Sequence, residues 1–168
     1  MKAGPRRIVL IAHLTCSVGW IGALAVFLAL AVVGLTTRDA QMTRAVYLAM
    51  GVTTRWVILP AALASLLTGV VSSLGTGWGL LRYYWVVVKL LITVFSTIVL
   101  LIHLQPIQVL ARSAATAHTW SSDLENVQLM MVDASGAALA ALLALTALSV
   151  YKPRGLTPFG ARKAAAGH

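Results

Sequence analysis

The sequence predicts an all-α membrane protein: a four-transmembrane-helix antiparallel bundle with N- and C-termini cytoplasmic. Two observations carry this prediction. Of the 168 residues, 60% are hydrophobic and only 10% are charged, whereas soluble domains average about a quarter charged residues. The apolar residues also gather into four long stretches with short polar segments between them. A chain so poor in charge cannot cover a water-facing surface, so its outer surface must face lipid.

Charge and cysteine content exclude several other classes of protein. The net charge of +9 could indicate nucleic-acid binding, but the basic residues lie at the ends of apolar segments, as membrane topology requires, and form no single patch. We therefore expect no nucleic acid as partner. The single Cys16 excludes an intrachain disulfide, and the chain has no Cys/His zinc spacing. The first apolar run is too long for the core of a signal peptide, about 7–15 residues, and reads as a retained span.

The first two spans are expected at residues 8–35 and 56–74. At 1.5 Å per residue the first covers about 42 Å, enough for a hydrocarbon core of about 30 Å. Residues 41–54 are less apolar, and form either a short interfacial helix or the overhanging start of the second span. Pro60 is tolerated in a first helical turn, but should kink the helix if the helix starts earlier.

The third and fourth spans are expected at residues 80–104 and 127–151. Aromatic residues at the start of the third span are typical of a headgroup boundary. Pro106 predicts a kink or stop there, and the mixed segment 107–120 is expected to be helical in part. The fourth span is rich in alanine and glycine, which allows close helix contact.

The four spans form one transmembrane domain, residues 1–152, followed by a tail, residues 153–168. The prolines and glycines of the tail predict that it is mobile and, with the orientation below, cytoplasmic. Positive charge is retained on the inner side of a membrane, so the side with more basic residues should be the cytoplasm. One side carries Lys2, Arg6, Arg7, Arg82, Lys152, Arg154, Arg162 and Lys163; the other carries Arg38, Arg44, Arg55 and Arg112 with Asp39, Asp123 and Glu125.

Polar residues inside the spans mark the expected interior of the bundle, because polar groups in hydrocarbon are costly. Helical spacing places them on one stripe of each helix, and turning all four stripes inward gives a polar interior. Its ligand candidates are His13, Cys16, Lys89, Thr93, Ser96, His103 and Asp133.

Depth along the helices separates these candidates. His13 lies near the cytoplasmic end and His103 near the other, about 20 Å apart by helical rise. Asp133 falls within a turn of His103, so a His103–Asp133 hydrogen bond is expected, with Arg55 or Arg112 as other partners for the carboxylate. Alternatively, Asp133 simply links two helices.

His13 has two interpretations. It either bonds a neighbouring carbonyl or hydroxyl, or takes part in metal or haem ligation or proton transfer. Cys16 faces the same way, and a histidine with a cysteine on one turn would suit copper. Lys89 is expected to extend to the cytoplasmic headgroups.

Four stretches resemble a group of small uncharacterised bacterial integral membrane proteins, found often in actinobacteria. The resemblance covers about residues 8–150 and implies four spans in the bacterial cytoplasmic (inner) membrane, with no known role. The stretches are residues 13–22, 59–69, 78–90 and 100–106.

The first span is also distantly similar to the copper-resistance D type of membrane protein. This similarity lies in His13, Trp20 and Gly22. The methionine-rich and multi-histidine features of a copper protein are missing here, so neither resemblance supplies a catalytic residue.

Three functions stay open on the sequence. The first is a redox or metal-binding protein with haem b or copper, its metal candidates being His13, Cys16 and His103. The two histidines lie too far apart in depth to share an iron. A single haem would therefore need a methionine, a cysteine or a second subunit as the other ligand, and Met130 or Met131 could approach His103. The second is a small oligomeric proton, ion or solute transporter or channel. The third is an accessory protein in a larger membrane complex.

Of these, the sequence favours a non-enzymatic membrane bundle that binds a small ligand, a haem or metal cofactor, or a partner protein at a polar interior. The alternative is the small oligomeric transporter or channel, because the polar track spans most of the bilayer and four helices leave little room for a pore within one chain. No motif demands an enzyme, although enzymatic activity stays open.

Overall fold

The chain folds into helices that run almost its whole length. The structure, a computed structural model, describes residues 3–75, 79–116, 122–153 and 155–165. Its helices are α1 (Ala3–Thr36), α2 (Ala40–Thr53), the π-helical turn η1 (Thr54–Ile58), α3 (Leu59–Leu74), α4 (Tyr84–Thr116), α5 (Ser122–Tyr151) and α6 (Pro158–Ala165).

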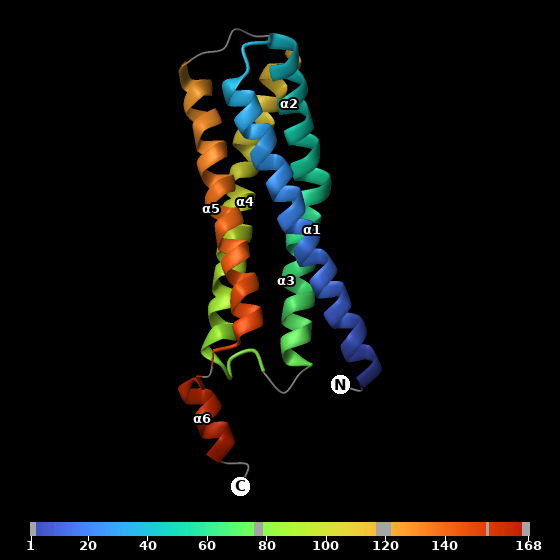
Figure 1. The fold of residues 1–168 in the computed structure, drawn as a ribbon, viewed down its shortest axis with the longest axis vertical. Helices are drawn as coiled ribbons and strands as arrows, with labels where there is room; N and C mark the ends of the chain where they lie inside the picture. The colour runs from blue at the N-terminus through green and yellow to red at the C-terminus, as the bar shows by residue number, and fades with distance from the viewer. Residues whose placement is uncertain (1–2, 76–78, 117–121, 154, 166–168) are drawn as a thin grey trace.

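Four long rods lie side by side in one bundle (Figure 1). They are α1, the continuous α2–η1–α3 rod, α4 and α5, and within the described residues these are the helices long and apolar enough to cross a membrane. Helix α1 begins and α5 ends at the same end of the bundle, which we call the terminal end; the α1–α2 turn lies at the opposite, distal end (Figure 1). The predicted all-helical fold with four membrane-length helices is therefore confirmed.

Residues 41–54 belong to the second rod, as its overhanging start. Asp39 caps α2 by accepting a hydrogen bond from the Gln41 N–H at 2.9 Å. The rod then continues through η1 into α3 without a break. Pro60 lacks an N–H and cannot close the regular helical bond to residue 56. The π-helical turn directly before Pro60 accommodates this missing bond. The irregularity that the sequence predicts at Pro60 as a kink is therefore seen here as a π-helical turn.

Pro106 does not stop the third span. Helix α4 passes through it and ends at Thr116. Ile107, Leu110 and Ala114 are all buried, and α4 packs along α2 in this part of the bundle. Burial of this apolar face keeps the chain helical beyond the predicted end of the span, because packing stabilises a helix more than local propensity does.

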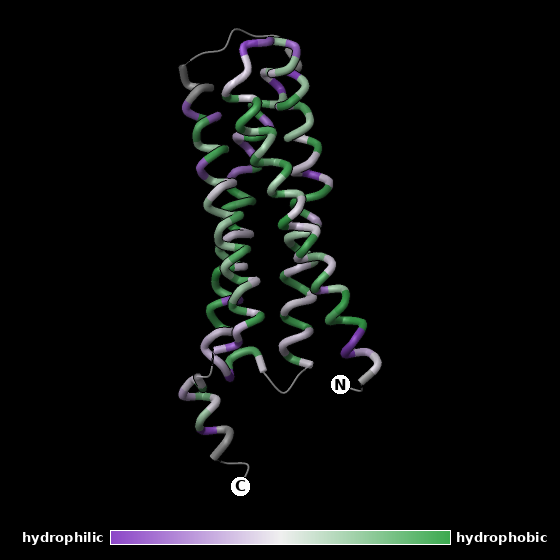
Figure 2. The backbone as a smooth tube through the Cα atoms, in the orientation of Figure 1, coloured by the Kyte–Doolittle hydropathy of each residue, from purple (hydrophilic) through white to green (hydrophobic). Residues whose placement is uncertain are grey.

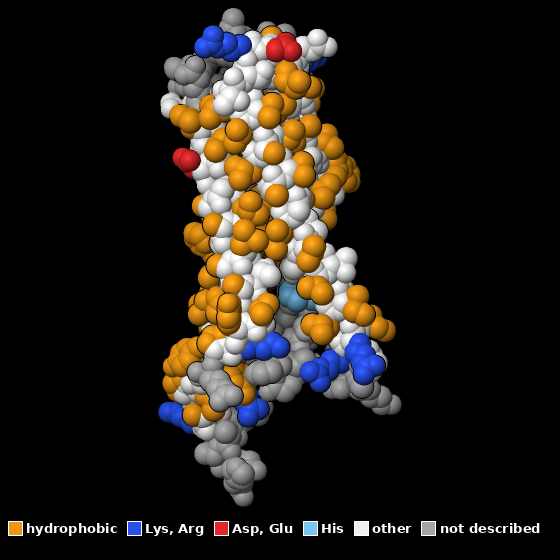
Figure 3. Space-filling view, in the orientation of Figure 1, with side chains coloured by type: hydrophobic (Ala, Val, Ile, Leu, Met, Phe, Trp, Pro, Cys, Tyr) orange, Lys and Arg blue, Asp and Glu red, His pale blue; other side chains and the backbone are white. Residues whose placement is uncertain are grey.

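The outer surface of the bundle is apolar. Large hydrophobic side chains are exposed along each rod, among them Leu67 at 66% and Leu143 at 53%. They cover the face shown in Figure 3, where charged side chains gather towards the two ends. Figure 2 shows the same division along the backbone, with hydrophilic segments at both ends of the bundle. A surface this apolar is expected for contact with lipid.

The tail after α5 has a defined place, which composition did not indicate. Thr157 donates its backbone N–H to the Arg82 carbonyl at 3.0 Å and its hydroxyl to the Leu81 carbonyl at 2.5 Å. The Gly155 carbonyl accepts the Tyr84 N–H at 3.2 Å. These bonds hold α6 at the terminal end of the bundle, against the start of α4. The predicted mobility of the tail stays a prediction.

Candidate functional site

The predicted inward stripe of α1 packs against α3 through a polar crossing near the terminal end. His13 Nδ1 lies 3.1 Å from the Ser65 carbonyl oxygen and 3.3 Å from Thr68 Oγ1. One turn further along α1, Ser17 Oγ lies 2.8 Å from Ser65 Oγ. Because the Ser65 carbonyl can only accept, Nδ1 carries the proton. The interpretation of His13 as a histidine bonded to a neighbouring carbonyl and hydroxyl is confirmed.

The ring of His13 also explains Gly69 on the facing helix. A Cβ on Gly69 would lie 3.0 Å from His13 Cε1, so the glycine makes room for the ring. Lys89 lies near enough for its charge to act on His13. The crossing is thus a packed interhelical contact.

Copper does not fit at this crossing. His13 Nδ1 is occupied by the bond to Ser65, which leaves Nε2 and the half-buried thiol of Cys16 as donors. Among the described residues, no three His, Cys, Asp or Glu side chains gather into a group that could hold a metal ion. Zinc sites use three or four protein ligands and blue-copper sites use two histidines and a cysteine, so this crossing offers fewer donors than either.

Lys89 connects α4 to α5. Its Nζ donates to Ser149 Oγ at 2.5 Å and lies 5.9 Å from the centroid of the Trp85 ring. The Ser149 hydroxyl in turn donates to the Leu145 carbonyl at 2.8 Å. Thr93, one turn further along α4, is half-buried. Whether the ammonium of Lys89 also reaches the headgroups stays a prediction.

His103 and Ser96 line a small cavity in the middle of the bundle. The cavity measures about 50 Å³, and Trp20, Phe27 and Met131 close it. His103 Nδ1 donates to the Val99 carbonyl of its own helix at 2.7 Å. Space of this size holds a few water molecules at most.

A haem does not fit in this central cavity. His103 and Met131 do line it together, as the single-haem hypothesis required. Ligand pockets, however, measure about 300–1,000 Å³, several times the space available. These residues therefore do not form a haem site in this structure.

Asp133 does not face the interior, and the predicted His103–Asp133 bond is wrong. Asp133 is exposed on the outer surface of α5. The buried positions of that helix are Met131, Ser135, Leu142 and Leu145, and they define its inner face. Asp133 lies two residues from Met131, which turns it by about 200° to the opposite side.

This correction removes Asp133 from the predicted polar track. Its distal end, Asp133, lies outside the bundle. Between the levels of His13 and His103, the buried side chains of Trp20 and Leu24 fill the interior.

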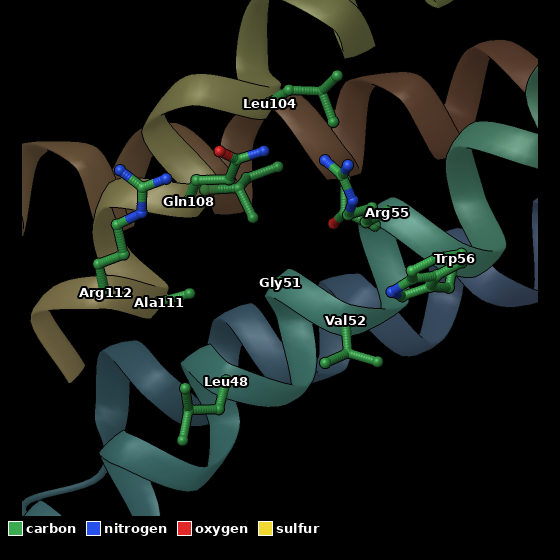
Figure 4. A pocket seen from close by; sticks show the side chains of 11 residues that line it. Leu48, Gly51, Val52, Arg55, Trp56, Leu104, Gln108, Ala111 and Arg112 are labelled. Atoms are coloured by element: carbon green, nitrogen blue, oxygen red, sulfur yellow. The ribbon is translucent and has the colours of Figure 1, made fainter. Parts of the chain in front are cut away.

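A larger hollow than the central cavity lies in a cleft between α2–η1 and α4 towards the distal end (Figure 4). It measures about 360 Å³. Two arginines, Arg55 from η1 and Arg112 from α4, extend into it, and Gln108 lies between them in this view (Figure 4). The residues that line it are Leu48, Gly51, Val52, Thr54, Arg55, Trp56, Leu104, Ile107, Gln108, Ala111 and Arg112. We call this the distal cleft.

Local structure forms both sides of the distal cleft. The π-helical turn carries Arg55 and Trp56 outwards, while Thr54 beside them is buried and donates its hydroxyl to the Met50 carbonyl at 2.8 Å. Such π-helical turns are frequent at functional sites. On the floor of the cleft, a Cβ on Gly51 would lie 3.0 Å from the Cβ of Ala111. The two helices therefore approach closely beneath the arginines.

The charge of the distal cleft is positive. Arg55 and Arg112 each carry one positive charge, and none of the described residues that line the cleft is acidic. From the sequence, these two arginines are expected to mark one side of the membrane and to be partners for Asp133, and Gln108 is not singled out. An arginine beside a tryptophan within an apolar segment, as at Arg55 and Trp56, is the signal that could have indicated the site.

Comparison of this chain with protein-family models, curated proteins and solved structures finds no match. The resemblances based on sequence motifs stay predictions.

Proposed function

We propose that this chain is a multi-pass protein of the bacterial cytoplasmic membrane that binds a small ligand in the distal cleft and carries out no chemistry of its own. The observation that carries the proposal is the size of the cleft. Its volume of about 360 Å³ falls in the range of small-molecule sites, about 300–1,000 Å³. The central cavity of about 50 Å³ does not. The proposed ligand site is therefore the distal cleft on the side of the bundle, and not the polar interior that the sequence favours.

The charge pattern supports a specific position of the bundle in the membrane. From Asp133 to Lys152 the helical rise gives about 28 Å, and from Arg55 to Leu74 it gives about the same. Both lengths match a hydrocarbon core of about 30 Å. Trp56, which is 71% exposed, and Tyr151, which is 84% exposed, then lie at the two boundaries, where aromatic residues gather.

With this position, the distal part of the bundle extends beyond the hydrocarbon. The distal cleft begins at the level of Arg55 and continues to Arg112, so it lies among the headgroups of one leaflet. The terminal end carries more basic residues, which favours the cytoplasm for both termini and the outer leaflet for the cleft. Exposed Asp133 then meets headgroups and water instead of lipid chains.

Filling the cleft tests the proposal. Leu104→Trp adds an indole to the wall of the distal cleft, so it should remove the bound ligand. Leu101→Trp adds the same group on the exposed face of α4, so it is the matched control. Native mass spectrometry of protein extracted in mild detergent measures the retained small molecule. The parent and Leu101→Trp should retain it at one per chain, and Leu104→Trp should lose it at least ten-fold. Equal retention in both variants, or none in the parent, contradicts the proposal.

A further inference from the structure

We infer that the ligand of the distal cleft is an anionic phospholipid, with its phosphate between Arg55 and Arg112 and its chains in the bilayer below. This inference rests on the proposed function, since it names the ligand class of the same site. Three features of the cleft carry it: the charge of its lining, its opening to the side, and its size.

The lining charge selects an anion. Two guanidinium groups extend into the cleft (Figure 4), and the described residues that line it include no carboxylate. Each guanidinium is a planar fork that can donate two parallel hydrogen bonds to phosphate oxygens. The amide of Gln108, between the arginines in Figure 4, can donate a further bond. A zwitterionic lipid would bring its own cation against these groups, so a lipid with net negative charge is preferred.

The opening of the cleft selects a ligand with an apolar chain. Leu48, Val52 and Trp56 line one wall, and all three are exposed on the outside of the bundle. A ligand entering from the side therefore passes over exposed apolar side chains. Trp56 and Leu104 lie at the end of the cleft nearer the membrane centre by helical rise. A chain that leaves between them continues directly into the hydrocarbon.

The size of the cleft separates the headgroup from the chains. A volume of about 360 Å³ accommodates a phosphate with its polar substituent, but not the acyl chains of a phospholipid as well. The chains therefore stay in the leaflet. Such a site takes its ligand from the membrane, and a soluble phosphate, which gains nothing from the apolar wall, should bind much less well.

Lipid exchange in nanodiscs tests this inference. The full chain is placed in phosphatidylcholine discs containing a minor fraction of phosphatidylglycerol, and bound lipid is read by native mass spectrometry after release into detergent. We expect the parent to enrich phosphatidylglycerol at least ten-fold. Arg55→Gln or Arg112→Gln should each lower the enrichment at least roughly ten-fold, because each removes a charged group that donates hydrogen bonds to the phosphate.

Matched controls separate this charge effect from misfolding and from other ligands. Arg38→Gln removes an exposed arginine outside the cleft and should leave the enrichment unchanged. Arg55→Lys keeps the charge without the fork and should retain part of it. Glycerol phosphate at millimolar concentration should not displace the lipid. Displacement by glycerol phosphate would identify a free phosphate as the ligand and overturn the lipid assignment.

The outcomes also distinguish this inference from the proposed function. One outcome is that the parent retains a neutral or zwitterionic molecule, that Leu104→Trp loses it, and that neither arginine variant changes its retention. The cleft is then a ligand site but not an anionic-lipid site. If Leu104→Trp has no effect on any retained molecule, the proposed function itself fails.

Discussion

Replacing Gly34 with valine is expected to destabilise the protein more than any other glycine substitution in the bundle core. A Cβ at this position would lie 2.8 Å from both Cζ and Oη of Tyr47. The Tyr47 side chain is 1% exposed, so the ring has no free space into which it could move. Overpacking of a core site costs about 1–3 kcal/mol, and the branched valine should reach the upper end of that range.

Gly22→Val is the control for this substitution. Gly22 lies on the same helix, and no atom would lie within 4 Å of its Cβ. Unfolding in detergent, followed by circular dichroism, measures the free energy of unfolding. A second variant that adds Tyr47→Leu to Gly34→Val should recover part of the loss, because it removes the ring that the valine meets. Equal stability of Gly34→Val and Gly22→Val would show that α1 and α2 do not pack as described.

Gly160→Ala is expected to release the tail without unfolding the bundle. A Cβ on Gly160 would lie 2.3 Å from the Arg82 carbonyl oxygen and 3.1 Å from its carbonyl carbon. These are backbone atoms at the start of α4, so they cannot rotate away. The tail must then detach, with loss of the bonds from Thr157 to Leu81 and Arg82.

Hydrogen exchange over residues 155–162 measures this release. Each lost bond contributes about 0.5–1.5 kcal/mol, so protection should fall on the order of ten-fold to a hundred-fold, while α1 and α5 keep theirs. Gly155→Ala is the control, since its Cβ would make an ordinary 3.6 Å contact with Tyr84 Cδ2. If exchange in the tail is as slow in Gly160→Ala as in Gly155→Ala, the described position of α6 is wrong.

The spans could be predicted from the sequence because the solvent that a segment requires depends on the residues of that segment alone. A long run of apolar residues must coil to satisfy its own backbone in lipid, and this reasoning needs no knowledge of neighbouring helices. The ends of the helices could not be predicted in the same way. Residues 107–116 are too polar to read as a span, yet they are helical because Leu110 and Ala114 are buried beside α2.

The predicted inner face of α5 is wrong because the prediction equates polarity with burial, and so turns Asp133 inwards. In α1 this assumption holds, since His13 and Ser17 meet Ser65 across a helix contact. In α5 it fails, because Asp133 lies at the end of an uncharged stretch, where headgroups can solvate a carboxylate. The spacing of Met131, Leu142 and Leu145, all buried, indicates the inner face correctly.

Arg55 beside Trp56 marks one side of the distal cleft in the sequence, but the cleft itself depends on which helices pack together. Arg55 and Arg112 come from segments far apart in the chain, and only the packing of α2 against α4 brings them to one hollow. The close approach at Gly51 and Ala111 and the π-helical turn before Pro60 determine its shape. Neither feature has a distinct sequence pattern.

Cysteine labelling tests the central claim, that the four rods cross a membrane with both ends of the chain on one side. In a Cys16→Ser background, single cysteines replace Gly4, Arg38, Leu67, Leu143 and Arg162, all of which are exposed on the isolated chain. A membrane-impermeant maleimide applied to intact cells should label position 38 at once and positions 4 and 162 only after permeabilisation. Positions 67 and 143 should stay unlabelled in both conditions, because lipid excludes the water that a reactive thiolate needs. Labelling of 67 and 143 as fast as 38, or of 4 and 162 from opposite sides, would contradict the claim.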